Sequence, residues 1–186
     1  FFWIGGLNVN LLPVLFTGGC VLCSPSPDPD ILAEVLEREQ VTRVAMWPAQ
    51  ARNLHDAAAR DGRDLSRIRM GLFEPRDRAG AVIPIERRMG GVFGMTESFG
   101  MHSIWPLNEP APPGKAGLMG PSLKGVERRI VDPASGEIVK TGTAGELQIR
   151  GHTLMLGYYK RSRADSFTAD GFFPTGDLCV EDEEGF

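Results

Sequence analysis

Glycine and proline divide this sequence into short segments, and they limit what it can fold into more than any other feature. Together they account for 37 of the 186 residues. That is about 20%, above the average of roughly 12% and below the roughly 25–30% that marks disordered chains. Such a density of turn-forming residues favours a globular fold of short helices and strands joined by tight turns.

The first half of the chain alternates between helical and strand patterns. Asp30 is the expected N-cap of a helix whose apolar residues recur at helical spacing. Alternating strands and helices argue for a parallel sheet with helices packed against it. The expected helices are 11–16, 31–40 and 49–60, and the expected strands are 20–23 and 41–46.

The second half has short segments bounded by turns. Residues 126–131 and 137–139 flank the turn DPASG and predict a hairpin, and 145–151 alternates apolar and polar residues. The predicted fold class is therefore α/β, a parallel sheet with flanking helices followed by a small antiparallel, barrel-like sheet. The boundary is expected where Pro and Gly concentrate, giving an α/β part at 1–110 and a β-rich part at 111–186.

Composition and charge exclude some classes of function. The chain is 42% hydrophobic and 24% charged, with a net charge of −4, so it carries no electrostatic footprint for nucleic acid. Its apolar opening, FFWIGGLNVNLLPVLF, is interrupted too often by Gly, Asn and Pro for a membrane span. Cys20, Cys23 and Cys179 form no disulfide framework. We expect the first two to be buried strand thiols of a cytoplasmic protein.

The stretch FGMTE at 93–97 is the first candidate site. The Thr96 hydroxyl can donate to a phosphate oxygen, and the glycine before it allows close approach of the backbone. The Glu97 carboxylate can hold Mg²⁺, which usually takes one or two carboxylates together with substrate phosphates. The alternative is structural, with Thr96 capping a helix.

The stretch GFFPTGDL at 171–178 is the second candidate site. Asp177 can accept two hydrogen bonds from the vicinal hydroxyls of a ribose, and Gly176 leaves the approach open. The alternative is an aspartate in the turn of a β-hairpin.

The order of several motifs resembles the adenylate-forming superfamily, and most closely its acyl-CoA synthetases. In that family a strand ending in Tyr-Gly-x-Thr-Glu is followed by Gly-Glu-(x)₄-Gly, Gly-Tyr and Gly-Trp-(x)₂-Thr-Gly-Asp. The corresponding stretches of this chain are FGMTE at 93–97, GELQIRG at 145–151, GYY at 157–159 and GFFPTGDL at 171–178.

The resemblance implies a nucleotide site. Thr96 would contact the phosphate, Glu97 would bind Mg²⁺, and Asp177 would hold the ribose hydroxyls. Phe93 stands where the family has an aromatic residue that stacks on adenine, but without the tyrosine hydroxyl. The family's adenine loop looks short here, with Gly71 as the one candidate for its glycine.

The resemblance also implies an acyl pocket. Gly94 and Met95 would lie against the acyl adenylate, in contact with both its nucleotide and its acyl part, and Trp3 would lie near the acyl channel. His102 is a candidate for lining the same pocket, or a loop histidine bonded to a neighbour.

By the same resemblance, the protein would use ATP, Mg²⁺ and coenzyme A to activate a carboxylic acid substrate. The family's phosphate loop would precede the first residue, and its C-terminal domain would follow the last. We therefore expect the chain to be a piece of the large N-terminal domain, to need the rest of its own chain, and to be inactive alone. The alternatives are a peptide-synthetase adenylation domain and a non-catalytic nucleotide-binding or scaffold remnant of the same fold.

Overall fold

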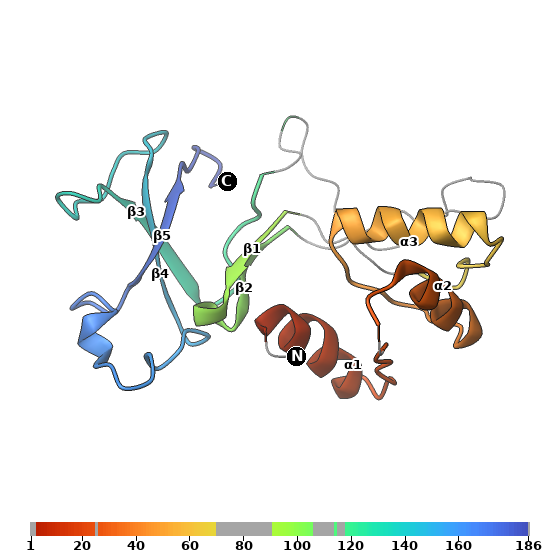
Figure 1. Cartoon of the computed structure of the whole chain (residues 1–186). Helices are drawn as coiled ribbons and strands as arrows, with labels where there is room; N and C mark the ends of the chain where they lie inside the picture. The colour runs from red at the N-terminus through yellow and green to blue at the C-terminus, as the bar shows by residue number, and fades with distance from the viewer. Residues whose placement is uncertain (1–2, 25, 70–90, 106–113, 115–117, 186) are drawn as a thin grey trace. The chain divides into compact units, whose positions relative to one another are not determined.

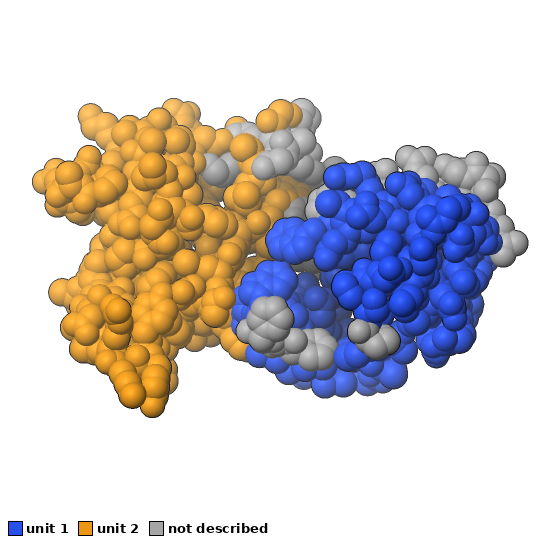
Figure 2. Space-filling model, viewed as in Figure 1, with its two compact units in different colours: residues 1–89 blue, residues 90–186 orange. Residues whose placement is uncertain are grey.

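The computed structural model describes two compact units, residues 1–89 and 90–186 (Figure 2). The residues described are 3–24, 26–69, 91–105, 114 and 118–185. The division at 89/90 falls earlier in the chain than the expected boundary at 110/111, because the hairpin at residues 92–104 joins the later unit. The predicted split into an α/β part and a β-rich part stays a prediction.

The first unit is helical in its described part, and the three expected helices are confirmed (Figure 1). Ala33 and Leu36 of one helix pack with Leu54 and Ala58 of the next in a small apolar core. No described helix is long and apolar enough to cross a membrane. The helical elements are a π-helical turn at Gly5–Leu11, α1 at Leu12–Phe16, α2 at Pro29–Arg38 and α3 at Pro48–Arg60.

The two strands expected in this unit are not formed. Residues 20–23 have no regular structure, and residues 41–46 contribute a single bridge position at Arg43. An apolar run becomes a strand only when a neighbour pairs with its backbone, and the described residues supply none, so the parallel sheet is not shown. The prediction that Cys20 and Cys23 are buried is wrong, because both are exposed.

The N-cap of α2 is Asp28 rather than the predicted Asp30. An oxygen of the Asp28 carboxylate accepts from the backbone N–H of Asp30 at 2.9 Å and from that of Ile31 at 3.4 Å. Pro29 explains the shift, because proline favours the first helical position, where its missing N–H has no intrahelical partner to lose. The residue before it then becomes the cap.

We predict that Asp28→Ala destabilises α2 by about 1 kcal/mol, because two N–H groups lose their acceptor. Amide hydrogen exchange in α2 should become about fivefold faster. Asp30→Ala is the control. It removes an exposed ion pair with Arg60 and a negative charge in the first turn of α2, and it leaves both capping hydrogen bonds in place. Equal effects of the two substitutions would contradict the assignment.

The second unit is built from antiparallel strands (Figure 1). One pair forms a hairpin, and the other three form a sheet in the order β3-β4-β5. Residues 137–139 pair with β3 only through a bridge at Ile138, so the main partner of β3 is β4. Closure of this sheet into a barrel is not shown. The strands are β1 at Val92–Met95, β2 at Gly100–Ile104, β3 at Val126–Val131, β4 at Gly145–Gly151 and β5 at Phe173–Cys179.

One apolar core joins the hairpin to the sheet. The core consists of buried residues from β3, β4 and β5 together with Phe167, and Phe93 and Met95 of β1 pack against it. Backbone contacts add to this packing, since the N–H of Leu123 donates to the His102 carbonyl at 2.9 Å. The candidate site residues of β1 and β5 thus belong to one packed unit. The buried members from the strands are Val126, Ile130, Leu147, Ile149 and Phe173.

Two arginines enclose an aromatic ring on this sheet. The guanidinium carbons of Arg129 and Arg150 lie 4.0 and 4.5 Å from the centre of the buried Phe172 ring. Arg129 donates to the Asp170 carboxylate at 2.6 Å. Hydrogen bonds from Arg129 and Thr168 lower the pKa of Asp170 to about 2. The carboxylate therefore helps to hold Arg129 over the ring.

We predict that Asp170→Asn lowers the free energy of unfolding at neutral pH, because Arg129 loses its charged acceptor. A lowered native pKa stabilises the fold above the unfolded value, near 3.9, and this contribution disappears as the pH falls through about 2. Urea unfolding should show that the difference in the free energy of unfolding between the native protein and the variant narrows between about pH 4 and 2. A constant difference would contradict the prediction.

Candidate functional site

The turn that carries Thr96 and Glu97 is fixed by a buried serine. Residues 96–98 form a single 3₁₀ turn between β1 and β2. The Ser98 hydroxyl accepts from the Met95 N–H at 3.2 Å and lies 2.7 Å from the Gly100 carbonyl oxygen, to which it donates. The Thr96 side chain is exposed, and the residue before the turn is Met95. Thr96 therefore does not act as the helix cap of the structural alternative.

Gly94 allows the two strands of the hairpin to come close together. A Cβ atom on this residue would lie 2.3 Å from the Gly100 carbonyl oxygen and 2.6 Å from the Met101 Cα atom. Both neighbours are backbone atoms, so a side chain at this position would push the strands apart. The glycine predicted to contact the acyl adenylate thus has a structural role in the hairpin.

His102 occupies a β-bulge of β2, not the loop that the sequence suggested. Phe93 pairs with Ser103 and Gly94 pairs with Met101, so His102 is the extra residue. Its side chain is 1% exposed, and its ring centre lies 4.9 Å from that of Phe93. His102 Nδ1 is 3.1 Å from the Ser103 hydroxyl. Its Nε2 has no hydrogen-bond partner among the described residues.

Burial lowers the pKa of His102. Asp177 opposes this shift because its negative charge favours the imidazolium, and the positive charge of Arg128 adds to it. The charges of Asp177 and Arg128 therefore act on His102, although the three residues come from three different strands. The imidazole is held neutral against the Phe93 ring.

A second bulge presents Asp177. The register of β4 with β5 shifts around Leu147, and residues 175–177 make the extra length of β5. Gly176 has a φ of +79°, which glycine adopts without strain. The Thr175 hydroxyl donates to the Leu147 carbonyl at 2.8 Å and accepts from the Asp177 N–H at 3.1 Å. The predicted ribose ligand is therefore held by its backbone while its side chain is half-buried.

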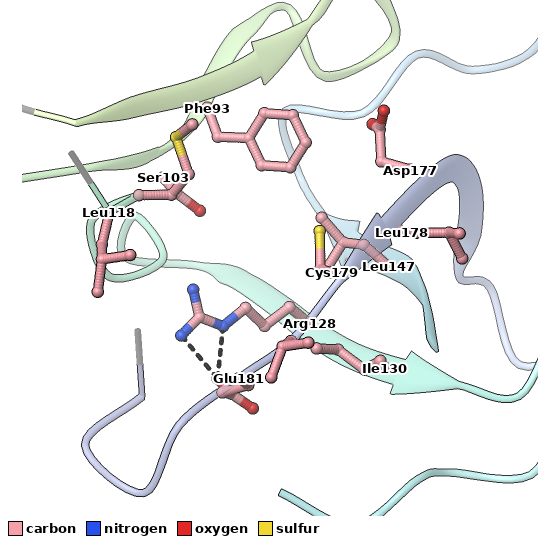
Figure 3. A pocket seen from close by; sticks show the side chains of 12 residues that line it. Phe93, Ser103, Leu118, Arg128, Ile130, Leu147, Asp177, Leu178, Cys179 and Glu181 are labelled. Atoms are coloured by element: carbon pink, nitrogen blue, oxygen red, sulfur yellow. Dashed lines mark hydrogen bonds and ion pairs between the residues drawn. The ribbon is translucent and has the colours of Figure 1, made fainter. Parts of the chain in front are cut away.

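Phe93 and Asp177 line one hollow of about 400 Å³ (Figure 3). The hollow lies wholly within the second unit. Its walls are mostly apolar, and Arg128 in its lining is paired with Glu181 at 2.6 Å. Two carboxylates line the hollow, those of Glu181, which is paired with Arg128, and of Asp177. An aromatic side chain, apolar walls and the Asp177 carboxylate suit a flat ring that carries hydroxyl groups. The other lining residues are Ser103, Leu118, Met119, Ile130, Leu147, Leu178, Cys179 and Val180.

Glu97 lies at the end of the hairpin and is contacted by the segment after β4. The Tyr158 hydroxyl donates to Glu97 Oε1 at 2.7 Å, and the Met155 N–H donates to the Glu97 carbonyl at 2.7 Å. This hydrogen bond to the carboxylate is the main cause of a raised Tyr158 pKa. The sequence does not predict this contact. The GYY motif marked the segment, but nothing in it indicated which residue the tyrosine would meet.

Glu97 could supply one protein ligand of a magnesium site, but the other ligands would have to come from substrate phosphates and water. No group of three acidic, histidine or cysteine side chains able to hold a metal occurs in the described part of the chain. Glu97 offers one carboxylate, and Tyr158 already occupies one of its oxygens. Mg²⁺ is commonly bound by one or two carboxylates plus substrate phosphates. Glu97 could therefore hold the ion together with bound phosphates.

Among the predicted site residues of the second unit, only Phe93 and Asp177 belong to the described lining of the hollow. Trp3 belongs to the first unit, where its ring stacks on that of Trp47 at 5.9 Å between centroids. Its role near the acyl channel stays a prediction. Gly71, the candidate glycine of the adenine loop, lies outside the described residues.

Comparison with known proteins identifies the family. Residues 1–159 match the model of a family described as AMP-binding enzyme. The chain belongs to this family. The chain is 30% identical over 194 residues to 4-coumarate–CoA ligase 1 of Arabidopsis thaliana. It is 36% identical over 187 residues to 2,3-dihydroxybenzoate-AMP ligase of Bacillus subtilis. The predicted membership of the adenylate-forming superfamily is confirmed.

The chain is much shorter than these relatives. The alignments cover 98% and 95% of the chain but 34% of each relative, so it spans about a third of their length. Among solved structures, apo MatB of Rhodopseudomonas palustris is 26% identical with a TM-score of 0.72, covering 99% of this chain and 37% of MatB. The fold is therefore that of part of an adenylate-forming enzyme.

We predict that His102 makes the fold less stable as the pH falls from 7 to 5. Its native pKa is lowered, so the unfolded chain binds the proton more readily and stability is lost below the unfolded value near 6.5. His102→Asn should remove this part of the pH dependence. Amide hydrogen exchange of β2, measured across that range, is the test, with His55→Asn on α3 as the control. An unchanged pH dependence in His102→Asn would contradict the assignment.

Proposed function

We propose that the protein is an AMP-forming acid–thiol ligase. It would activate a carboxylic acid as an acyl adenylate with ATP and then transfer the acyl group to a thiol, that of coenzyme A. The observation that carries the proposal is that Phe93 and Asp177, from motifs far apart in the sequence, line the same hollow. An aromatic ring for adenine and a carboxylate for ribose are the two contacts that a nucleoside needs.

The nucleoside would lie between these two side chains. The Phe93 ring offers a face for stacking on adenine, and the buried His102 ring packs against it at 4.9 Å between ring centres. The two carboxylate oxygens of Asp177 can each accept a hydrogen bond from one ribose hydroxyl. The bulge at Gly176 keeps the space around the backbone open, because no atom lies within 4 Å of a Cβ built there.

The phosphates would lie over the 96–98 turn. The exposed Thr96 hydroxyl can donate to a phosphate oxygen. Glu97 would hold Mg²⁺ with the oxygen that Tyr158 leaves unused, and the ion would supply Lewis-acid stabilisation of the charge on the phosphoryl oxygens. Gly94 and Met95, which precede the turn on β1, would contact the acyl adenylate.

The proposed chemistry needs no covalent enzyme intermediate. A carboxylate oxygen of the substrate attacks the α-phosphorus of ATP, the bond to the bridging oxygen breaks, and pyrophosphate leaves with its electrons. Preorganised donors such as Thr96 stabilise the charge that develops. The thiolate of coenzyme A then attacks the acyl carbon, and AMP leaves with the electrons of the carbon–oxygen bond.

The names of the relatives support the first step most directly. Both the 4-coumarate–CoA ligase and the 2,3-dihydroxybenzoate-AMP ligase are named for carboxylic acids, as is the indoleacetate–CoA ligase of Aromatoleum aromaticum at 30% identity. Coenzyme A appears in two of these three names. A carrier-protein thiol is the second candidate acceptor, because the 2,3-dihydroxybenzoate-AMP ligase is named for the adenylate and not for coenzyme A.

The test is acid-dependent ATP–pyrophosphate exchange by the protein as its gene encodes it, with a panel of aryl and fatty acids. Asp177→Asn should raise the KM for ATP by about tenfold or more, because the ribose loses a charged acceptor worth about 1.5–3 kcal/mol. Glu97→Gln should lower exchange at limiting Mg²⁺. Asp56→Asn, an exposed aspartate of α3, is the control and should change neither.

Product analysis with coenzyme A then identifies the acceptor. Formation of an acyl adenylate without thioester would favour a carrier-protein thiol. Nucleotide binding without exchange for any acid would favour the non-catalytic scaffold. Unchanged kinetics in both Asp177→Asn and Glu97→Gln would overturn the site itself. The 186-residue chain alone is expected to support no exchange.

A further inference from the structure

Building on the proposed function, we propose that Tyr158 is a positioning residue that orients the Glu97 carboxylate for the metal and its phosphates. The two residues are 61 positions apart, yet the Tyr158 hydroxyl donates to Glu97 Oε1 at 2.7 Å. A carboxylate held by one oxygen can rotate only within a narrow range, and its second oxygen then points in a defined direction. Hydrogen-bonded partners of this kind commonly determine the affinity of a metal site.

A second contact makes the arrangement specific to Glu97. The Met155 N–H donates to the Glu97 backbone carbonyl at 2.7 Å. The segment from Met155 to Tyr158 thus donates hydrogen bonds to both the main chain and the side chain of Glu97. Its two neighbours in the turn differ. Thr96, one position earlier, is exposed, and the buried Ser98, one position later, donates to the Gly100 carbonyl.

The segment from Met155 to Tyr158 is itself held against the sheet. One terminal nitrogen of Arg163 donates to the carbonyls of Met155 and Leu156, both at 2.9 Å. The Arg163 guanidinium carbon lies 3.6 Å from the centre of the Phe167 ring, and that ring packs against Phe173 of β5. Tyr158 is therefore fixed relative to the strand that carries Asp177. The hydroxyl links the metal side of the site to the ribose side.

A tyrosine suits this position better than a basic residue would. It supplies one hydrogen bond without a positive charge, so the Glu97 carboxylate keeps its full attraction for a divalent cation. Lys160 does not replace it, because the Lys160 ammonium lies 5.2 Å from the centre of the Tyr159 ring. Tyr159 is 88% exposed and gives a matched control for Tyr158, which is 42% exposed.

The experiment compares Tyr158→Phe with Tyr159→Phe in the protein as its gene encodes it. Each variant loses one hydroxyl and keeps its ring. In Tyr158→Phe, the Mg²⁺ concentration for half-maximal pyrophosphate exchange should rise about tenfold, the low end of the effect of removing such a partner. Saturating Mg²⁺ should restore most of kcat, and the KM for the acid should stay unchanged. Tyr159→Phe should behave as the parent.

A binding measurement complements the kinetics. Electron paramagnetic resonance of Mn²⁺ in the presence of ATP should show weaker metal binding in Tyr158→Phe and parental binding in Tyr159→Phe. An equal Tm of all variants shows that the fold is intact.

The outcomes separate this inference from the proposed function. Metal affinity within twofold of the parent in Tyr158→Phe, with Glu97→Gln impaired, would overturn the positioning role and leave the ligase proposal standing. A loss of kcat in Tyr158→Phe that saturating Mg²⁺ does not restore would also overturn it. No effect of Glu97→Gln would instead overturn the proposed site of metal binding.

Discussion

The close approach of two backbones at Gly94 is the constraint on which the candidate site depends. With no Cβ at this position, β1 can approach the Gly100 carbonyl of β2 directly. The hairpin then keeps the register in which His102 bulges out and Phe93 packs on the sheet core. The turn that carries Thr96 and Glu97 closes the same hairpin. A larger residue here would disturb the predicted adenine, phosphate and metal contacts together.

Two β-bulges set the positions of His102 and Asp177 in the second unit. The first places the His102 ring against the Phe93 ring, and the second presents Asp177, which lines the hollow together with Phe93. Bulges redirect side chains without breaking a sheet, and they often occur beside active sites. The contact between Tyr158 and Glu97 adds a third link, because it ties the hairpin turn to the segment that follows β4. The site is thus held by long-range contacts within one unit.

The local elements could be predicted from sequence wherever a local signal decides them. The helices at 31–40 and 49–60 have apolar residues at helical spacing, and α2 and α3 form there. Alternating residues in GELQIRG similarly predicted β4. The prediction of strands at 20–23 and 41–46 was wrong, because a strand needs a neighbouring strand to pair with, and a local sequence pattern does not reveal one. The cap at Asp28 was missed because Pro29, not the acid at 30, determines where α2 begins.

The sequence by itself determined the family and the chemical types of the site residues, because short motifs such as FGMTE and PTGD specify side chains and their order. Only the tertiary structure decided which of these side chains meet. Phe93 and Asp177 line one hollow, His102 is buried against the Phe93 ring, and Tyr158 reaches Glu97. The physical reason is that these contacts depend on strand register and bulges. Register is determined by packing across the whole sheet, and no single stretch of sequence records it.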